Sequence, residues 1–260
     1  MLESLYIGAT GLHAQQLSVD TIANNIANLN TPGFKKSNVN FQDLMYRELS
    51  KTTTTAGAQQ VLQRSGAGVG VANATKSFAA GDIKETDAPL DLAVRGDGFV
   101  EVTLPDGSLA YSRGGTLQIT PDGLLATPEG YPLRASIHIP SDASKLSIAT
   151  DGTVMVTTAS SKTPTALGQI ELAKFANAGA LKPLGNNLYR VTESSGDPIY
   201  GKAGADGFGQ LAQGFLEMSN VKLNDEMVNL MVAQRAYEVN TKLIQASDEL
   251  MSMSNNLRKG

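Results

Sequence analysis

Apolar residues recur every seven positions near the end of the chain, between residues 219 and 257. Neither Gly nor Pro interrupts this stretch, so the pattern predicts one long amphipathic helix. Ser219 is the expected N-cap, and Asp225 and Glu226 lie where the helix dipole favours negative charge. Such a helix would be about 55 Å long at about 1.5 Å per residue. The apolar stripe comprises Leu223, Leu230, Tyr237, Ile244 and Met251, widened by Met227, Ala233, Leu243, Leu250 and Leu257.

A second stripe with the same period lies at the start of the chain and predicts a helix over residues 3–29. Gly8, Gly11 and Gln15 weaken it. Because each helix alone is too weak to be stable in water, we expect the two ends to pair as a coiled coil in a terminal core of residues 1–36 and 216–260. That pairing is either an intramolecular hairpin or an interface between subunits. The stripe comprises Leu5, Leu12, Val19 and Ile26, with Ile22 and Leu29 in the second seam position.

The first predicted helix ends in an asparagine-rich segment that contains Asn24, Asn25 and Asn28. Asparagine is a mediocre helix former, so we expect these side chains to form hydrogen bonds with other segments. Pro32 and Gly33 then predict a change of chain direction.

Residues 37–77 are expected to form a linker or an extended arm. Phe41, Leu44, Met45 and Leu49 have helical spacing, but residues 52–60 contain no large apolar side chain and are rich in Thr, Gln, Ala and Gly. This composition is typical of a linker or an extended arm, which cannot pack a core of its own but can become ordered against a neighbour.

Short alternating apolar runs separated by turn residues predict a β-rich domain over residues 78–215. Turns are expected at Pro105-Asp106-Gly107, Pro121-Asp122-Gly123, Pro128-Glu129-Gly130, Asp151-Gly152 and Gly185-Asn186-Asn187. The predicted fold class is therefore α+β, in which an all-β sandwich or barrel is inserted between two terminal helices. The pairs Ile137/Ile139, Leu146/Ile148, Val154/Val156 and Ile170/Leu172 are among the predicted strand residues.

Composition narrows the function. Aromatic residues make up 5 % of the 260 residues, there is no Trp, and the net charge is −4 without a basic cluster. We expect no nucleic-acid partner. Cysteine is absent, which excludes disulfides and thiolate chemistry. No apolar run reaches the roughly 20 residues of a membrane span, and the start of the chain lacks the basic and apolar regions of a cleaved signal peptide.

Catalytic, metal and cofactor sites are not expected. His13 and His138 have no local triad partners, and the Ser219-x-x-Lys222 motif lacks the companion motifs of penicillin-binding enzymes. The glycine-rich residues 66–70 lack the lysine of a P-loop. Asp82, Glu85, Asp87 and Asp91 match no calcium loop, and Arg95-Gly96-Asp97 is expected to serve turn geometry.

Three motifs resemble one family, the bacterial flagellar rod and hook (axial) proteins. The first motif combines Asn24-Asn25-Ile26-Ala27-Asn28 with Thr31-Pro32-Gly33-Phe34-Lys35. The second combines residues 93–99 with Tyr111-Ser112-Arg113 and Asp122-Gly123-Leu124-Leu125. The third combines residues 217–221, including Ser219 and Asn220, with Gln234-Arg235-Ala236-Tyr237-Glu238-Val239-Asn240. Length and an extra arm at about residues 46–68 are most similar to the distal rod member.

The resemblance implies a non-enzymatic subunit that polymerises with itself into a rigid hollow drive shaft. The implied partners are the proximal rod proteins, the hook protein, the P-ring and L-ring proteins and the flagellar type III export apparatus, through which subunits leave the cell without a cleaved signal. Phe41 and Met45 resemble a short hydrophobic motif that docks on the export gate. The alternatives are another axial member of the family, either proximal rod or hook, and a β-rich hydrolase from a different class.

Overall fold

The computed structural model describes residues 2–44, 47–49, 63–66, 68–159 and 163–257, and these residues form two compact units. Unit 1 comprises residues 1–26, 37–75 and 222–260, and unit 2 comprises residues 27–36 and 76–221. The division differs from the predicted domains, because the arm belongs with the helices and residues 27–36 belong with the β-rich part. The helices and the sheets confirm the α+β class.

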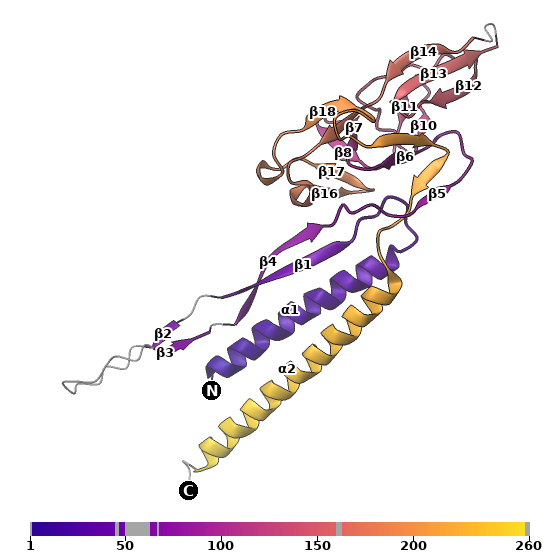
Figure 1. Ribbon diagram of the computed structural model, residues 1–260. Coiled ribbons are helices and arrows are strands. Elements are labelled where there is room, and N and C mark those ends of the chain that lie inside the picture. Colours follow the sequence, from indigo (N-terminus) through magenta and orange to yellow (C-terminus); the bar gives the residue numbers. More distant parts are fainter. Residues whose placement is uncertain (1, 45–46, 50–62, 67, 160–162, 258–260) are drawn as a thin grey trace. The chain divides into compact units, whose positions relative to one another are not determined.

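Unit 1 contains two helices that run antiparallel (Figure 1), α1 (Leu2–Ala27) and α2 (Leu223–Leu257). The predicted N-cap at Ser219 is wrong. The Ser219 hydroxyl accepts a hydrogen bond from the Val221 N–H at 3.3 Å, before the helix begins, and the Glu226 N–H donates to the Lys222 carbonyl at 3.1 Å. Asp225 and Glu226 do lie in the first turn of α2, as expected.

Small residues bring the two helices close together. A Cβ built at Gly8 would lie 2.8 Å from Ile244 Cγ1, and one built at Gly11 would lie 2.9 Å from Asn240 Nδ2. Gly8 faces Ile244 and Gly11 faces Asn240, so the residue number on α2 falls as the residue number on α1 rises. This is the order expected of an antiparallel pair. Gly8 and Gly11 thus let α2 approach α1 closely, a role that their weakening of the apolar stripe did not indicate. Ala14 and Ala233 are also buried.

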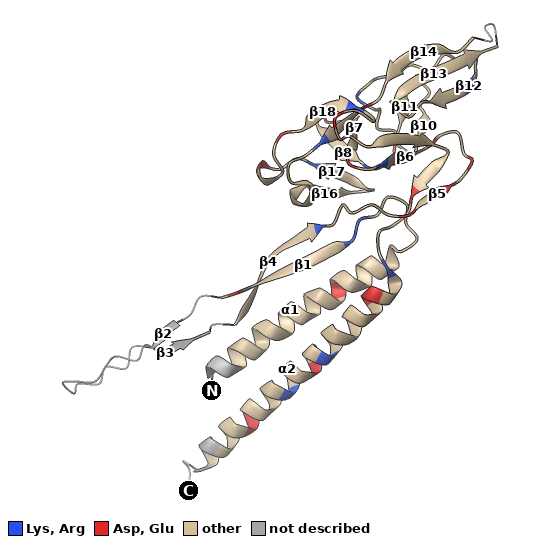
Figure 2. Ribbon diagram, viewed as in Figure 1, with Lys and Arg blue, Asp and Glu red and all other residues tan. Residues whose placement is uncertain are grey.

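The predicted seam residues are not fully buried in the single chain. Leu223 and Tyr237 are 41 % and 42 % exposed. Further apolar side chains of α2 are also exposed, and Met227, Leu243 and Leu250 among them belong to the predicted stripe. Charged residues of both signs alternate along the helix (Figure 2). The partly buried members are Leu5, Leu12, Val19, Ile22, Ile26, Leu29, Leu230, Ile244 and Met251. The exposed series comprises Met227, Val228, Met231, Val232, Val239, Leu243, Leu250 and Met253.

The arm is built from two-stranded β-ribbons in unit 1. Strand β1 (Ser37–Asp43) pairs with β4 (Val69–Lys76), and β2 (Arg47–Leu49) pairs antiparallel with β3 (Gln63–Ser65). Phe41 and Leu49, two of the residues with helical spacing, lie in strands and not in a helix, because pairing with a distant strand overrides local periodicity. Phe41 lies in β1 and is 40 % exposed. Met45 and residues 50–62, which include the whole threonine-rich segment, lie outside the described residues.

Unit 2 is built around a six-stranded antiparallel sheet with the order β16-β17-β8-β7-β15-β18. Smaller sheets have the orders β19-β6-β9, β12-β13-β14, β10-β11 and β20-β5. The strand bounds are β5 Ile83–Glu85, β6 Asp91–Arg95, β7 Phe99–Thr103, β8 Leu109–Ser112, β9 Gly114–Thr116, β10 Gln118–Ile119, β11 Leu125–Ala126, β12 Ala143–Ile148, β13 Thr153–Thr158, β14 Thr165–Gln169, β15 Glu171–Lys174, β16 Lys182–Gly185, β17 Leu188–Arg190, β18 Ile199–Lys202, β19 Gln210–Gln213 and β20 Phe215–Glu217. Two short 3-10 helices span Ala178–Ala180 and Glu193–Ser195.

The turn predictions in unit 2 are confirmed by backbone angles. Gly107, Gly123, Gly130 and Gly152 all have positive φ, between 79° and 89°. Ile137 and Ile139 do not form the predicted strand. Their side chains are buried at 2 % and 4 % exposure, but the segment contributes only the isolated Leu124–His138 bridge to the described β-structure.

The middle strands of the six-stranded sheet, β8, β7 and β15, are largely buried, and each face of the sheet has its own core. On β7, Val100 and Val102 enter a large aliphatic core, whereas Phe99 enters an aromatic cluster, because alternate residues face opposite sides. In this cluster Phe99 packs edge-on against Phe78 and Phe175, with centroid separations of 5.1 and 5.5 Å. Five aromatic residues, Phe78, Phe99, Tyr111, Phe175 and Tyr189, thus stabilise this face of the sheet. No helix in the described part of the chain is both long and apolar enough to cross a membrane.

Replacement of Leu172 by alanine is expected to destabilise unit 2 by about 2–5 kcal/mol, because Leu172 is fully buried and the change leaves a cavity. Urea unfolding followed by circular dichroism measures the effect. Ile199→Ala is the control, since Ile199 is 62 % exposed on β18. Equal unfolding free energies for the two variants would contradict the assignment of Leu172 to the core.

Candidate functional site

Two of the sequence motifs come together inside unit 2. The Gly33 N–H donates to the backbone carbonyl of Glu217 at 2.7 Å, which places residues 33–36 beside the segment after β20. Gly33 has φ +72°, a conformation that L side chains rarely adopt, so the turn after Pro32 requires glycine. Its neighbour Phe34 is buried beneath the ammonium of Lys76, which lies 4.4 Å from the ring centroid.

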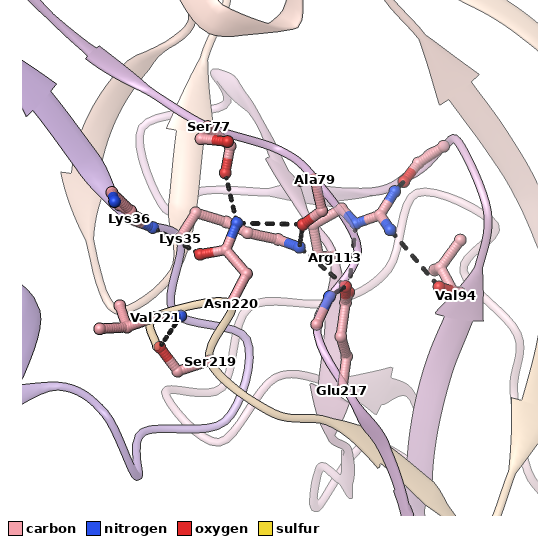
Figure 3. A network of polar contacts seen from close by, with 12 residues as sticks. Lys35, Lys36, Ser77, Ala79, Val94, Arg113, Glu217, Ser219, Asn220 and Val221 are labelled. Atoms are coloured by element: carbon pink, nitrogen blue, oxygen red, sulfur yellow. Dashed lines mark hydrogen bonds and ion pairs between the residues drawn. The ribbon is translucent and has the colours of Figure 1, made fainter. Parts of the chain in front are cut away.

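Glu217 is the centre of a buried ion network (Figure 3). Its Oε1 accepts hydrogen bonds from Lys35 Nζ at 2.7 Å and from the Gly81 N–H at 2.9 Å, and its Oε2 accepts from Arg113 Nε at 3.3 Å. The three ionic side chains are at most 3 % exposed. Four segments distant in sequence therefore converge on one carboxylate.

Two cations share this one anion, and backbone carbonyls stabilise the surplus positive charge. Lys35 Nζ also donates to the Ala79 carbonyl at 2.8 Å, and Arg113 Nη1 donates to the Gly98 carbonyl at 2.8 Å. Burial lowers the pKa of Lys35 from its ordinary value; the hydrogen bond and the charge of Glu217 act in the opposite direction, and the charge of Arg113 lowers the pKa further. Each charge depends on its partners, because an unpaired ion in this environment is costly.

Asn220 forms the second part of the network. Its Oδ1 accepts from the Lys36 N–H at 2.8 Å, and its Nδ2 donates to the carbonyls of Ser77 and Ala79 at 2.9 and 3.1 Å. An amide can do this because it has an acceptor and two donors at one end of a short side chain. In addition, the Ser77 N–H donates to the Lys36 carbonyl at 2.9 Å.

A comparable polar junction lies inside unit 1. Asn25 Oδ1 accepts from the Ser37 N–H at 2.9 Å, and Asn25 Nδ2 donates to the Ser37 carbonyl at 3.0 Å and to Glu226 Oε2 at 3.1 Å. Asn25 and Glu226 are both 1 % exposed. Asn25 thus joins α1 to β1 and to α2 within one chain, in line with the expectation that this segment bonds to other segments. Asn28 caps a local turn through Thr31, and Asn24 lies exposed on α1.

Sequence reasoning missed the ionic residues of the network. Lys35, Arg113 and Glu217 each lie within a quoted motif, but charged residues are normally solvent-exposed, and no local pattern pairs residues 182 positions apart. In each motif the charged residue stands close to turn-forming residues, and this pattern is the signal in the sequence that could have indicated the network. Gln234 and Arg235 of the third motif lie on the exposed face of α2 and do not contribute to this network.

The residues considered as catalytic or metal-binding candidates in the sequence do not lie together in the structure. His13 and His138 are exposed on different units, and Ser219 bonds to backbone two residues later. Asp91 is buried and accepts a hydrogen bond from the Thr86 hydroxyl at 2.6 Å. Among the residues that the structure describes, no three His, Asp or Glu side chains are arranged to hold a metal ion.

Comparison with known proteins first identifies the class of protein to which the chain belongs. Three family descriptions match successive parts of the chain: "Flagella basal body rod protein" over residues 5–35, "Flagellar hook protein FlgE/F/G D1 domain" over residues 93–156 and "Flagellar basal body rod FlgEFG protein C-terminal" over residues 212–257. The two-helix unit and the β-rich unit are thus those of a flagellar axial protein.

Full-length relatives define the family more narrowly. The chain is 41 % identical to the flagellar basal-body rod protein FlgG of Borreliella burgdorferi, with both chains covered completely, and 40 % identical to that of Bacillus subtilis, again over both full lengths. It is 41 % identical to FlgG of Buchnera aphidicola from Acyrthosiphon pisum over 96 % of this chain and 98 % of the relative. The chain belongs to the FlgG family of flagellar basal-body rod proteins. It is a structural subunit of the distal rod in the flagellar basal body and not an enzyme.

Replacement of Glu217 by glutamine is expected to destabilise unit 2 by about 3–5 kcal/mol, because Lys35 and Arg113 would remain buried without a counter-ion. Equilibrium unfolding measures the change. Glu85→Gln is the matched control, since Glu85 is exposed on the strand paired with β20. If both variants unfold at the same denaturant concentration, the ion network does not stabilise the fold.

Proposed function

We propose that the chain polymerises through its terminal helices into a helical, hollow and rigid shaft that transmits torque to the hook. The observation that supports this most directly is the exposed apolar face of α2. Met227, Met231, Val232 and Val239 are each at least 50 % exposed in the single chain. An apolar stripe of this length on a soluble subunit favours burial against another protein surface.

A second copy of the chain is the proposed occupant of that face. The inner face of α2 already contacts α1 through Gly8 and Gly11, so the outer face is available to a neighbour. A head-to-tail contact that does not close on itself generates a filament. In this arrangement the two helices, with the seam residues Leu230, Ile244 and Met251 between them, form a coiled-coil core with neighbouring helices. Unit 2 is proposed to form the outer layer of the shaft, which is what the resemblance to the family implies.

The remaining proposed partners follow from the family resemblance. They are the proximal rod proteins, the hook protein, the P-ring and L-ring proteins and the type III export apparatus. Phe41 is exposed on β1, where the export gate could reach it before assembly. We propose export without a cleaved signal peptide.

Assembly is expected to protect the terminal segments from proteolysis. In purified monomer, trypsin should cleave at Arg235 and Lys242 of α2, both of which are exposed. In polymer grown at high concentration the same bonds should resist cleavage, because a neighbouring subunit buries them. Mass spectrometry of the fragments is the measurement. Equal resistance of these bonds in monomer and polymer would contradict burial of α2 by a neighbouring subunit.

Val239→Glu is expected to raise the critical concentration for polymerisation by roughly tenfold or more. Burial of a valine side chain contributes about 1.5–3 kcal/mol, and the new carboxylate would have to be desolvated. Sedimentation of polymer at several protein concentrations measures the effect. Gln245→Glu introduces the same carboxylate at another exposed position of α2 and is the control. Unchanged polymerisation of Val239→Glu would exclude this face as the interface.

A further inference from the structure

Half of the sulfur-containing side chains of this protein belong to one helix. The chain has eight methionines and no cysteine, so thioethers are its only oxidisable sulfur groups. Four of the methionines lie in α2, at positions 227, 231, 251 and 253. A thioether is apolar and adaptable, but a small oxidant converts it into a polar group. The helix on which assembly is proposed to depend therefore carries a concentration of groups whose polarity can change.

Met227 and Met231 lie on the same face near the start of α2, because residues four positions apart are neighbours on a helix. Their side chains are 50 % and 51 % exposed in the single chain. Val228 and Val232, which follow them directly, are 54 % and 62 % exposed, whereas Ala233 on the side toward the helix pair is 4 % exposed. The two thioethers thus lie within an apolar patch that small solutes in water can reach.

A peroxide is the class of oxidant that reacts with such a thioether. The sulfur attacks one oxygen of hydrogen peroxide, an S–O bond forms and the O–O bond breaks. Sulfur loses two electrons, and the other oxygen leaves with the protons as water. The sulfoxide oxygen is a polar hydrogen-bond acceptor, and its burial without a donor is costly. An interface built from the aliphatic side chains of α2 would supply no donor to it.

We propose that Met227 and Met231 are oxidation sites that control assembly. The sulfoxide form of the subunit stays out of the polymer, whereas the thioether form is shielded from oxidant once a second copy covers it. The inference rests on the proposed function, because it takes a second copy of the chain as the occupant of the exposed apolar face of α2. The control is reversible, since methionine sulfoxide reductases, one for each sulfoxide epimer, restore the thioether.

Oxidation of the monomer before assembly tests the proposal. The purified chain is treated with hydrogen peroxide, mass spectrometry quantifies the sulfoxide at each methionine, and sedimentation gives the critical concentration for polymerisation. Sulfoxide at Met227 and Met231 is expected to raise the critical concentration roughly tenfold or more, because each new polar group would be buried without a partner. Treatment with the two methionine sulfoxide reductases should return it to the parent value.

Leucine substitutions show whether these two residues carry the effect. The double variant Met227→Leu/Met231→Leu keeps apolar side chains of similar volume, so it should polymerise like the parent and lose its sensitivity to peroxide. Met155→Leu is the matched control, since Met155 is a partly buried methionine on β13 of unit 2, and this variant should stay as sensitive as the parent. Met227→Gln/Met231→Gln introduces polar groups without oxidant and should itself raise the critical concentration.

Polymer formed before the treatment gives an independent readout. Susceptibility of methionine to oxidation follows exposure, so Met227 and Met231 should be oxidised about tenfold more slowly in polymer than in monomer.

An unchanged critical concentration after oxidation at both positions would overturn the proposal, and so would equal oxidation rates in monomer and polymer. Peroxide sensitivity that persists in the leucine variant would assign the effect to another methionine and would overturn it as well. Failure of the untreated parent to polymerise would instead contradict the proposed function. The two failures are distinguishable, because the second appears without any oxidant.

Discussion

The carboxylate of Glu217 is the constraint on which the β-rich unit depends. It is the only anion within hydrogen-bond distance of Lys35 in the described part of the chain, and it also holds Arg113 and the Gly81 backbone. A buried ion pair is often no more stabilising than well-packed apolar residues, but loss of one partner is severe. The pair also constrains the fold, because all four segments must reach the same carboxylate for these bonds to form.

Gly81 shows how tightly that arrangement is constrained. A Cβ at this position would overlap the Met218 carbonyl oxygen, so the backbone approaches the exit segment at the closest distance that glycine allows. The same approach lets the Gly81 N–H reach Glu217 Oε1. Close backbone contact and charge pairing are thus two aspects of one junction, which fixes residues 33–36 beside residues 217–221.

In unit 1, small and polar residues form the buried surface, unlike in the β-rich unit. Its inner surface is built from Gly8, Gly11, Ala14 and Ala233 with the buried polar pair Asn25 and Glu226, whereas many of its largest apolar residues lie outside. A monomer designed for stability alone would bury the large residues first. The inversion is expected of a subunit whose apolar surface is completed by neighbours, and in the proposed polymer it would couple the stability of the helices to assembly.

Local patterns in the sequence determined the two terminal helices, the glycine turns and the alternating strands, because periodicity and turn chemistry act over a few residues. The family could likewise be recognised from motifs at residues 24–35, 93–125 and 217–240. Features that depend on contacts between distant segments were decided only by the tertiary structure. The ribbon at residues 37–76 required strand pairing that overrides helical spacing, and the role of Gly8 depended on Ile244, which faces it from the other end of the chain. Lys35 and Glu217 are 182 residues apart, and no local property of either residue specifies that they form a buried pair.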